Sequence, residues 1–328
     1  MLRLGVIGCG RVTSMFHLRA IEQLPDVSVT AVLDIDEARM REAQTASGAE
    51  KAYNNSEEFF HDPDIDAVAI NTPPRVHEEL TLMALEHDMH VICEKPLTET
   101  PKGCLTIKDA QKSTGLVVLP AHNYRFTPSL NLMEEYLSQG SMGDITDIRV
   151  AFENNLRLYR SETNFRQTKE NGVVEDVLPH ILSVVQPIVG HINAVESVDW
   201  WCKDYDVCDN MKVCLGTSNV SVDANLSWTS LRPRFVVSVE CENGRLCSDL
   251  MMNPYKLEVS LNGHQETIRE KGIGWYIDLI KFKHPSFKNQ YHHFHQLVNG
   301  KESPKITIDD EINILETMKL VSDSMGSD

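Results

Sequence analysis

Apolar positions in the first third of the chain alternate between two patterns. Runs of strand length that are rich in apolar residues occupy residues 2–8, 27–34, 65–71, 90–93 and 116–119. Helical spacing of apolar side chains occupies the stretches between them, at residues 12–24, 36–46, 75–86 and 101–113. Buried parallel strands read as continuous apolar runs, and strands that alternate with helices pair in parallel. The pattern predicts an α/β domain over residues 1–122, with a doubly wound parallel sheet of the Rossmann type.

The pattern changes after residue 122. Short β-rich segments follow one another between residues 194 and 268, separated by turn signals such as Glu242-Asn243-Gly244. Such spacing predicts hairpins and a large, mainly antiparallel open sheet. Helical patterns at residues 129–139, 172–189, 286–299 and 309–324 make the second domain, residues 123–328, α+β. We expect the last helices to be able to pack back on the first domain.

Composition narrows the classes of partner. The formal charge of −17 disfavours nucleic acid and anionic membranes, since both require a basic surface. No apolar stretch is long enough to span a membrane, and no targeting signal is evident. The eight cysteines lack close CxxC pairs and predict free thiols in a reducing cytoplasm. A long open sheet exposes one face, so we expect a homodimer or homotetramer formed through it.

Two groups of aromatic and histidine residues are interpreted as structural and not as parts of a functional site. Trp200, Trp201 and Trp228 fall in strand patterns and are interpreted as sheet-packing residues. His292 and His295 share a helical face, but no carboxylate or cysteine follows at ligand spacing, so we predict no metal site.

A glycine pair marks the junction of the first strand and first helix. Gly8 and Gly10 permit a tight turn and close approach by a pyrophosphate, which the N–H groups of the helix N-terminus can bind. The full dinucleotide fingerprint has Gly or Ala at position 13, where this chain has Thr13. We expect that difference to alter helix–strand packing more than phosphate binding.

Asp34 ends the second strand, where a carboxylate can accept hydrogen bonds from the hydroxyls of an adenosine ribose. It would repel a 2′-phosphate, which favours NAD over NADP. The alternative is that Asp34 caps the following helix, although Asp36 is the better candidate for a cap. Arg39 could serve a 2′-phosphate, so NADP stays open.

The chain resembles the glucose–fructose oxidoreductase, inositol dehydrogenase and rhizopine-catabolism family (Gfo/Idh/MocA). The matching segments are GVIGCGRV (5–12), AINTPPRVHEEL (69–80), HVICEKPLTET (90–100), NYRFTP (123–128) and NGVVEDVLPHIL (171–182). The resemblance implies a dehydrogenase without zinc that uses NAD or NADP and acts on a sugar-like hydroxyl or ketone. It also implies a Rossmann domain followed by an open-sheet domain that often forms dimers or tetramers.

The same resemblance implies roles for individual residues. It places Arg11, Val12, Thr72, Pro73, His77, Glu94 and Asn123 at positions that bind the cofactor. It places Arg125, Tyr159 and Arg166 at positions near the substrate. In the family, Pro96 tends to follow a cis peptide bond that aims the preceding lysine inward.

Three residues carry the expected chemistry. Lys95 follows a predicted strand at the carboxyl edge of the sheet, where its ammonium can bind both cofactor and substrate and stabilise a developing alkoxide. Asp176 and His180 lie four residues apart, on one face of a predicted helix. We assign His180 as general base in oxidation and Asp176 as the residue that orients the substrate. Pro179 could kink the helix just before His180.

Several alternatives remain open at this point. Asp176 and His180 taken alone could be an ordinary i,i+4 surface pair, and Lys95 rather than His180 could carry the proton. The fold also supports NAD-sensing regulators without catalysis, and glycosidases that oxidise and re-reduce their substrate with NAD. Retention of Lys95, Asp176 and His180 favours a dehydrogenase or ketoreductase acting on a sugar, cyclitol or nucleotide sugar.

Overall fold

We describe a computed structural model of residues 1–159, 172–272 and 274–326. The chain divides into two compact units, each formed from two segments. The first comprises Met1–Phe126 and Ile273–Ile312, and the second comprises Thr127–Gly272 and Asn313–Asp328. The N-terminal unit therefore runs through Phe126, four residues past the predicted boundary, and includes a segment from near the C-terminus.

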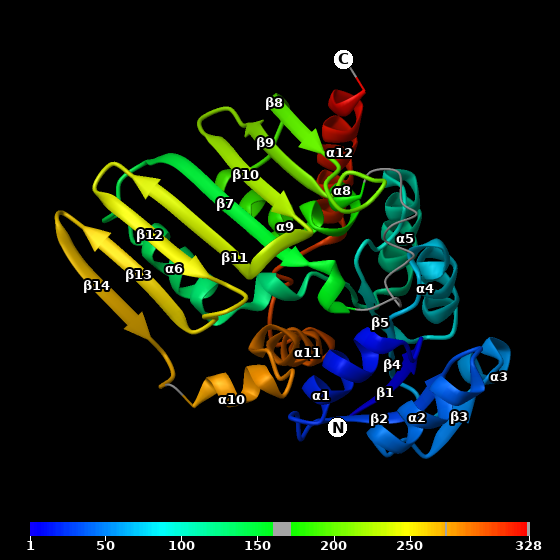
Figure 1. The fold of residues 1–328 in the computed structure, drawn as a ribbon. Helices are drawn as coiled ribbons and strands as arrows, with labels where there is room; N and C mark the ends of the chain where they lie inside the picture. Colours follow the sequence, from blue (N-terminus) through cyan, green and yellow to red (C-terminus); the bar gives the residue numbers. More distant parts are fainter. Residues whose placement is uncertain (160–171, 273, 327–328) are drawn as a thin grey trace. The chain divides into compact units, whose positions relative to one another are not determined.

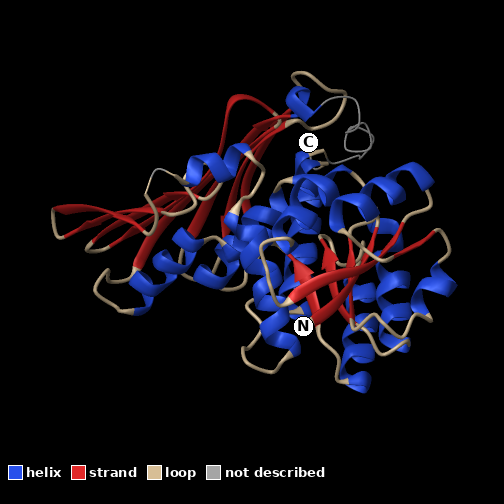
Figure 2. Cartoon of the chain, turned by 90° about the horizontal axis from the view of Figure 1, so that it is seen from below, coloured by secondary structure: helices blue, strands red, loops and turns tan. Residues whose placement is uncertain are grey.

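The first unit is built on a six-stranded sheet in which every described pair of strands is parallel. In the order of the sheet the strands are β3 (Lys51–Tyr53), β2 (Val27–Leu33), β1 (Leu2–Ile7), β4 (Ala67–Ile70), β5 (His90–Glu94) and β6 (Val118–Ala121). Helices lie on both faces of this sheet (Figure 2). The predicted doubly wound parallel sheet is confirmed, with its switch in strand order between β1 and β4.

The helical elements of the first unit connect these strands or follow them. They are η1 (Thr13–His17), α1 (Leu18–Ile21), α2 (Glu37–Ser47), α3 (Ser56–Phe60), η2 (Pro74–Val76), α4 (His77–Glu86), α5 (Pro101–Thr114), η3 (Asn123–Phe126), α10 (Trp275–Ile280) and α11 (Pro285–Val298). The long helix α12 (Ile308–Met325) begins in this unit, and its residues from Asn313 onward belong to the second.

The second unit contains an eight-stranded sheet, coloured from green to orange in Figure 1. In the order of the sheet its strands are β14 (His264–Arg269), β13 (Lys256–Leu261), β12 (Gly244–Asp249), β11 (Thr229–Cys241), β7 (Ile145–Asn155), β10 (Ser221–Ser227), β9 (Asn210–Gly216) and β8 (Ala194–Trp201). The β10–β7 pair is parallel and the other described pairs are antiparallel, which confirms the predicted mainly antiparallel sheet.

Helices of the second unit cover one face of that sheet. They include α6 (Pro128–Ser138) and α9 (Leu178–Val189), which lie behind the strands in Figure 1. The inward face carries apolar residues at alternate positions, such as Val150, Val213 and Val237, all of which are buried. Shorter helical elements are η4 (Leu156–Tyr159) and α8 (Val173–Asp176). Across the described parts of both units, no helix is long and apolar enough to cross a membrane.

Candidate functional site

The glycine turn after β1 leaves room for a ligand beside its backbone. Gly8 has a φ of +88°, and an added Cβ there would lie 2.8 Å from the Asn71 carbonyl oxygen. Gly10 differs, because a Cβ added there would meet nothing within 4 Å. Next to Gly8, the buried hydroxyl of Thr72 has no hydrogen-bond partner among the described atoms. Open space at Gly10 and a spare hydroxyl on Thr72 fit the pyrophosphate half of a dinucleotide.

Thr13 reinforces this turn. It is fully buried, and its hydroxyl donates a 2.7 Å hydrogen bond to the Gly8 carbonyl. The helix adopts π geometry over Thr13–His17, a form that is rare and found frequently at functional sites. The substitution of the third fingerprint position thus coincides with a local change in the helix. Arg11 and Val12 lie in the turn of helix just before it, and Val12 is 41% exposed.

Asp34 lies directly against the glycine turn. Its carboxylate accepts the Cys9 N–H at 2.6 Å and the Asp36 N–H at 2.8 Å. Asp36, by contrast, is the N-cap of α2 and accepts the Arg39 N–H at 3.1 Å. The capping role belongs to Asp36, which leaves Asp34 as the carboxylate at the end of β2.

The turn after β5 carries Lys95 and contains a cis Lys95–Pro96 peptide bond. His77 lies beneath it, fully buried, with Nδ1 2.7 Å from the Pro96 carbonyl oxygen and Nε2 2.8 Å from the Thr72 carbonyl oxygen. The ring therefore links the loop after β4 to the turn after β5. Pro73 precedes η2 in the same loop. Both ring nitrogens of His77 lie against backbone carbonyl oxygens, so the side chain holds these two loops together.

Glu94, the residue before Lys95, lies close to a buried histidine. His17 Nε2 is 3.1 Å from Glu94 Oε1, and His17 Nδ1 is 2.8 Å from the Tyr291 hydroxyl. Burial alone would raise the pKa of Glu94, but the contact with His17 and the nearby charge of Lys95 bring that pKa below its ordinary value. Burial, together with the Glu94 charge, raises the pKa of the Tyr291 phenol. Glu94 is thus held as a carboxylate beside Lys95.

A second carboxylate supports the same turn from the other side. Glu311, in the first turn of α12, accepts the Leu97 N–H at 2.9 Å with Oε1. Its Oε2 lies 2.5 Å from His122 Nε2, and both side chains are completely buried. Burial raises the pKa of Glu311, yet the charges of His122 and Lys95 and the two hydrogen bonds outweigh it and bring that pKa below the ordinary range.

Asn123 and Arg125 follow β6 in η3. The amide of Asn123 donates to the Ser286 hydroxyl at 2.9 Å, in the first turn of α11. Arg125 is 7% exposed. The predicted cofactor position Asn123 therefore also ties the end of β6 to the returning C-terminal segment.

In the second unit, Asp176 and His180 lie on consecutive short helices. The continuous helix predicted over residues 172–189 is wrong, because α8 ends at Asp176 and α9 begins at Leu178, with Val177 between them. Pro179 is in the first turn of α9 and has no N–H to donate to the preceding turn, which interrupts the helix. The i,i+4 relation of a single helix therefore does not describe this pair.

Packing fixes both side chains. The Trp228 indole N–H donates to Asp176 Oδ2 at 3.2 Å, and Trp228 is completely buried. The His180 ring stacks on Phe152, with ring centroids 5.4 Å apart and an interplanar angle of 10°. The Asp176 carboxylate is thus held by Trp228, which lies between strands β10 and β11. Tyr159 ends η4, its side chain is outside the described atoms, and Arg166 lies outside the described residues.

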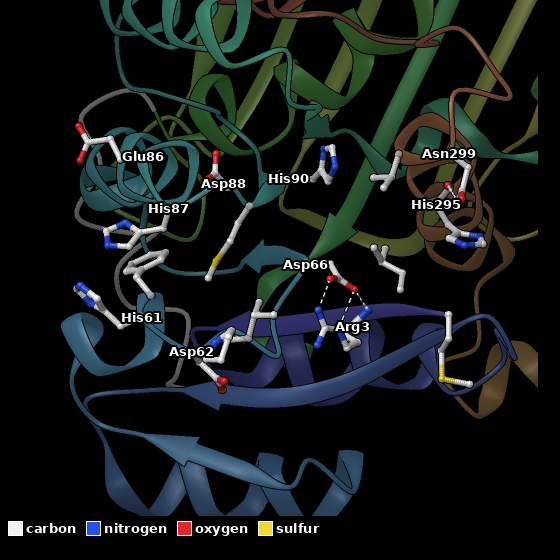
Figure 3. Close-up of a pocket in the computed structure, with 17 residues that line it drawn as sticks. Arg3, His61, Asp62, Asp66, Glu86, His87, Asp88, His90, His295 and Asn299 are labelled. Atoms are coloured by element: carbon white, nitrogen blue, oxygen red, sulfur yellow. Dashed lines mark hydrogen bonds and ion pairs between the residues drawn. The ribbon is translucent and has the colours of Figure 1, made fainter.

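The first unit also has a hollow that lies away from the glycine turn and the Lys95 turn (Figure 3). It measures about 800 Å³ and is lined by Arg3, Asp66 and His90, near the amino ends of β1, β4 and β5. Gly8 and Lys95 follow the carboxyl ends of β1 and β5, so the hollow is at the opposite edge of the sheet. Arg3 is committed there to Asp66 at 2.6 Å. Among the described residues, no group of three His, Cys, Asp or Glu side chains could hold a metal ion.

Comparison with known proteins agrees with this geometry. Residues 2–122 match the model of the Gfo/Idh/MocA oxidoreductase family, described as an NAD-binding Rossmann fold. This segment belongs to the Gfo/Idh/MocA family. The glycine turn, Asp34, Thr72 and the Lys95 turn all fall within it, so they lie in an NAD-binding Rossmann domain of that family.

Curated relatives match parts of the chain. A levoglucosan dehydrogenase from Pseudarthrobacter phenanthrenivorans is 32% identical over 164 residues, which are 48% of this chain and 41% of the relative. A myo-inositol 2-dehydrogenase from Thermotoga maritima is 30% identical over 149 residues, which are 45% of this chain and 44% of the relative. The chain thus matches less than half the length of these two relatives.

A solved structure with the same fold covers nearly the whole chain. An oxidoreductase from Agrobacterium radiobacter, in complex with NAD⁺, L-tartaric acid and magnesium, aligns with a TM-score of 0.86 at 19% identity. The alignment covers 99% of this chain and 96% of the other. At that identity the likeness shows the fold alone, and it covers the second unit as well as the first.

The Gfo/Idh/MocA signatures pointed to Gly8, Gly10, Asp34 and Lys95, but not to the side chains that hold them. His17, Tyr291, His122, Glu311 and Trp228 were missed, and Trp228 was interpreted only as a packing residue. Their sequence signal is weak, because each is an isolated residue far along the chain from its partner.

Proposed function

We propose that the protein is an NAD(P)-dependent dehydrogenase or ketoreductase that acts on a secondary hydroxyl or ketone of a sugar, cyclitol or nucleotide sugar. The observation that carries the proposal is the position of Lys95. It follows β5 at the carboxyl edge of an NAD-binding sheet, on a turn held by half-buried Glu94 and by buried His77 and Glu311. Ligands of open α/β sheets bind at that edge. The names of the relatives, levoglucosan and myo-inositol dehydrogenase, support a polyol substrate.

The chain's own residues would divide the work as follows. Nicotinamide, when bound, accepts or donates the hydride. The Lys95 ammonium donates a hydrogen bond to the substrate oxygen and stabilises negative charge on it. His180 takes the hydroxyl proton on a ring nitrogen during oxidation and returns it during reduction. Asp176, held by Trp228, accepts a hydrogen bond from a neighbouring substrate hydroxyl.

The remaining positions would bind the ligands. We propose that the dinucleotide is held by Gly8, Gly10, Arg11, Val12, Asp34, Thr72 and Pro73. Glu94 and Asn123 lie toward its nicotinamide end, and His77 supports that end. Arg125, Tyr159 and Arg166 are proposed to contact the substrate. These assignments rest on the family motifs and on the open space at Gly10.

A direct assay tests the proposal. Nucleotide released from the purified protein is identified, and sugars, cyclitols and nucleotide sugars are screened for a change in absorbance of the reduced nicotinamide. We expect a polyol to reduce NAD⁺ or a ketose to oxidise NADH. Glycoside cleavage without net NADH would support a redox-cycling glycosidase, and nucleotide binding without turnover of any compound would support a sensor.

Asp34 should favour NAD over NADP. Its carboxylate is fixed against the glycine turn, and Arg39 is 62% exposed and lies 3.7 Å from Asp36. We expect D34S to weaken NAD⁺ binding by about tenfold, because a charge-assisted hydrogen bond is lost, and to affect NADP⁺ far less. Isothermal titration with both nucleotides measures this. D36S is the matched control, since serine preserves the helix cap. An unchanged preference in D34S contradicts the assignment.

The second unit should form the contact between copies of the chain. Helices cover one face of its sheet, while Lys212, Asp223, Arg149 and Arg234 line a hollow of about 610 Å³ on strands β7–β11. A single-layered sheet face of eight strands is normally covered by another layer. We expect light scattering to give at least twice the 37.1 kDa of one chain, and a strictly monomeric mass contradicts this.

The eight unpaired cysteines support a cytoplasmic location.

A further inference from the structure

A buried carboxylate from the last helix reaches the turn that carries Lys95. Glu311 is completely buried, and its two oxygens have different partners: Oε1 accepts the Leu97 N–H at 2.9 Å, and Oε2 is 2.5 Å from His122 Nε2. Leu97 is two residues after Lys95, on the far side of Pro96. Glu311 therefore fixes the position of the backbone just beyond the lysine.

The charge state of Glu311 is part of this arrangement. A carboxylate in the interior is costly unless it is paired and hydrogen-bonded. Burial raises the pKa of Glu311, but the charge and hydrogen bond of His122, the Leu97 N–H and the charge of Lys95 lower it below the ordinary value. Glu311 is thus ionised at neutral pH. The attraction between Glu311 and Lys95 is mutual, so it favours the ammonium form of the lysine.

Other charged and titratable groups surround the same turn. Glu94 precedes Lys95 and is held as a carboxylate beside His17. His77 lies against the Pro96 carbonyl oxygen. The remaining groups are His122, Tyr291, Cys93 and Cys104, and burial raises the pKa of both thiols and of the phenol. Glu94 and Glu311 are therefore two carboxylates of this turn whose charge is stabilised by that of Lys95.

We propose that Glu311 is a positioning residue that holds the Lys95–Leu97 turn in place and serves, with Glu94, as a counter-charge that keeps Lys95 an ammonium. The proposal rests on the proposed function only in giving that ammonium a reaction to serve. A lysine kept protonated donates a hydrogen bond to the substrate oxygen and does not act as the base. The acceptance of the hydroxyl proton then falls to His180.

Amine labelling tests the charge state without any substrate. The full-length protein is treated briefly with acetic anhydride from pH 7 to pH 11, and acetylation of Lys95 is quantified by mass spectrometry. Only the neutral amine reacts, so the midpoint reports the lysine's ionisation. In E311Q we expect the midpoint to fall by about one pH unit, as loss of a nearby opposite charge predicts. The same midpoint in E311Q and in the wild-type protein overturns the proposal.

Two further variants separate charge from packing. E316Q removes one carboxylate from an exposed position of the same helix, and its midpoint should equal that of the wild-type protein. E311D keeps the charge on a shorter side chain, and its midpoint should lie closer to that of the wild-type protein than that of E311Q does. Equal midpoints in E311D and E311Q would assign Glu311 a structural role only and overturn the proposal.

A reciprocal measurement covers the case in which E311Q does not fold. Carboxyl ¹³C resonances of glutamate are followed with pH in the wild-type protein and in Lys95→Met, with the Glu311 signal identified by its absence in E311D. We expect the Glu311 midpoint to be higher in Lys95→Met, and an unchanged midpoint overturns the proposal. A shifted midpoint in a protein that turns over no polyol would leave this inference standing while the proposed function fails.

Discussion

Lys95→Met should lower kcat by about a thousandfold and leave NAD⁺ affinity within a few-fold of the wild-type value. Loss of one hydrogen-bond donor to a developing oxyanion costs on the order of 10²–10³ in kcat. Loss of a group that also helps to orient the reacting oxygen brings the effect to the upper end of that range. Methionine retains the apolar stem, so the turn between Glu94 and Leu97 keeps its packing. Steady-state kinetics on the substrate found by screening measures the effect.

The control for this prediction lies nearby in the same unit. Lys102 is exposed in the first turn of α5, and K102M should leave kcat unchanged. Nucleotide titration and thermal melting of both variants separate a loss of chemistry from a loss of fold. A Lys95→Met enzyme with more than a tenth of the wild-type kcat would remove Lys95 from the reaction.

The parallel sheet could be predicted because the central strands are buried on both faces and are therefore rich in apolar residues. β4 is completely buried and apolar throughout, and β1 and β5 are buried at most of their positions. β3 was missed for the opposite reason: it has three residues, all half-buried, and no pattern of period two can be recognised over that length. The hairpins from β11 to β14 followed from their turn residues, since Asn262 and Gly263 both adopt positive φ in the turn between β13 and β14.

Residues of the candidate site also differ in how far the sequence alone could predict them. Gly8, Gly10, Asp34 and Lys95 have local signals, because each role depends on a position at the end of a strand. The Glu311–His122 pair has none, since 189 residues separate its members and Glu311 reads as one more acidic residue in the first turn of a helix. Only the tertiary structure shows that its carboxylate is buried.

The segment with Asp176 and His180 shows that residue spacing alone does not determine helix geometry. The spacing of four residues predicted one helical face, but Pro179 divides the segment into α8 and α9. The orientation of Asp176 then depends on Trp228, which is 52 residues further along the chain. Strand periodicity identified Trp228 as buried, and it could not identify what the indole N–H binds.

His180→Ala should lower kcat by roughly 10²–10⁴, the range typical for loss of a general base. The His180 ring also stacks on Phe152, so truncation removes packing as well as a proton acceptor. Added imidazole distinguishes the loss of the proton acceptor from the loss of packing, because imidazole can occupy the space left by the missing ring and accept the proton. We expect added imidazole to restore part of the activity of His180→Ala. The control is His191→Ala, at an exposed position after α9, which should keep the wild-type kcat.

The dependence of kcat on pH tests whether His180 is the base. A base must be neutral to accept a proton, so kcat for oxidation in the wild-type enzyme should rise with pH across the range in which imidazoles titrate, about pH 5 to 8. That rise should be absent in His180→Ala and return with added imidazole at the pKa of free imidazole. The charge of Lys95 lowers the pKa of Glu94 and of Glu311, and the same attraction favours the ammonium form of the lysine, which does not accept a proton. A rise that persists unchanged in His180→Ala assigns the base to another group and leaves His180 a packing residue on Phe152.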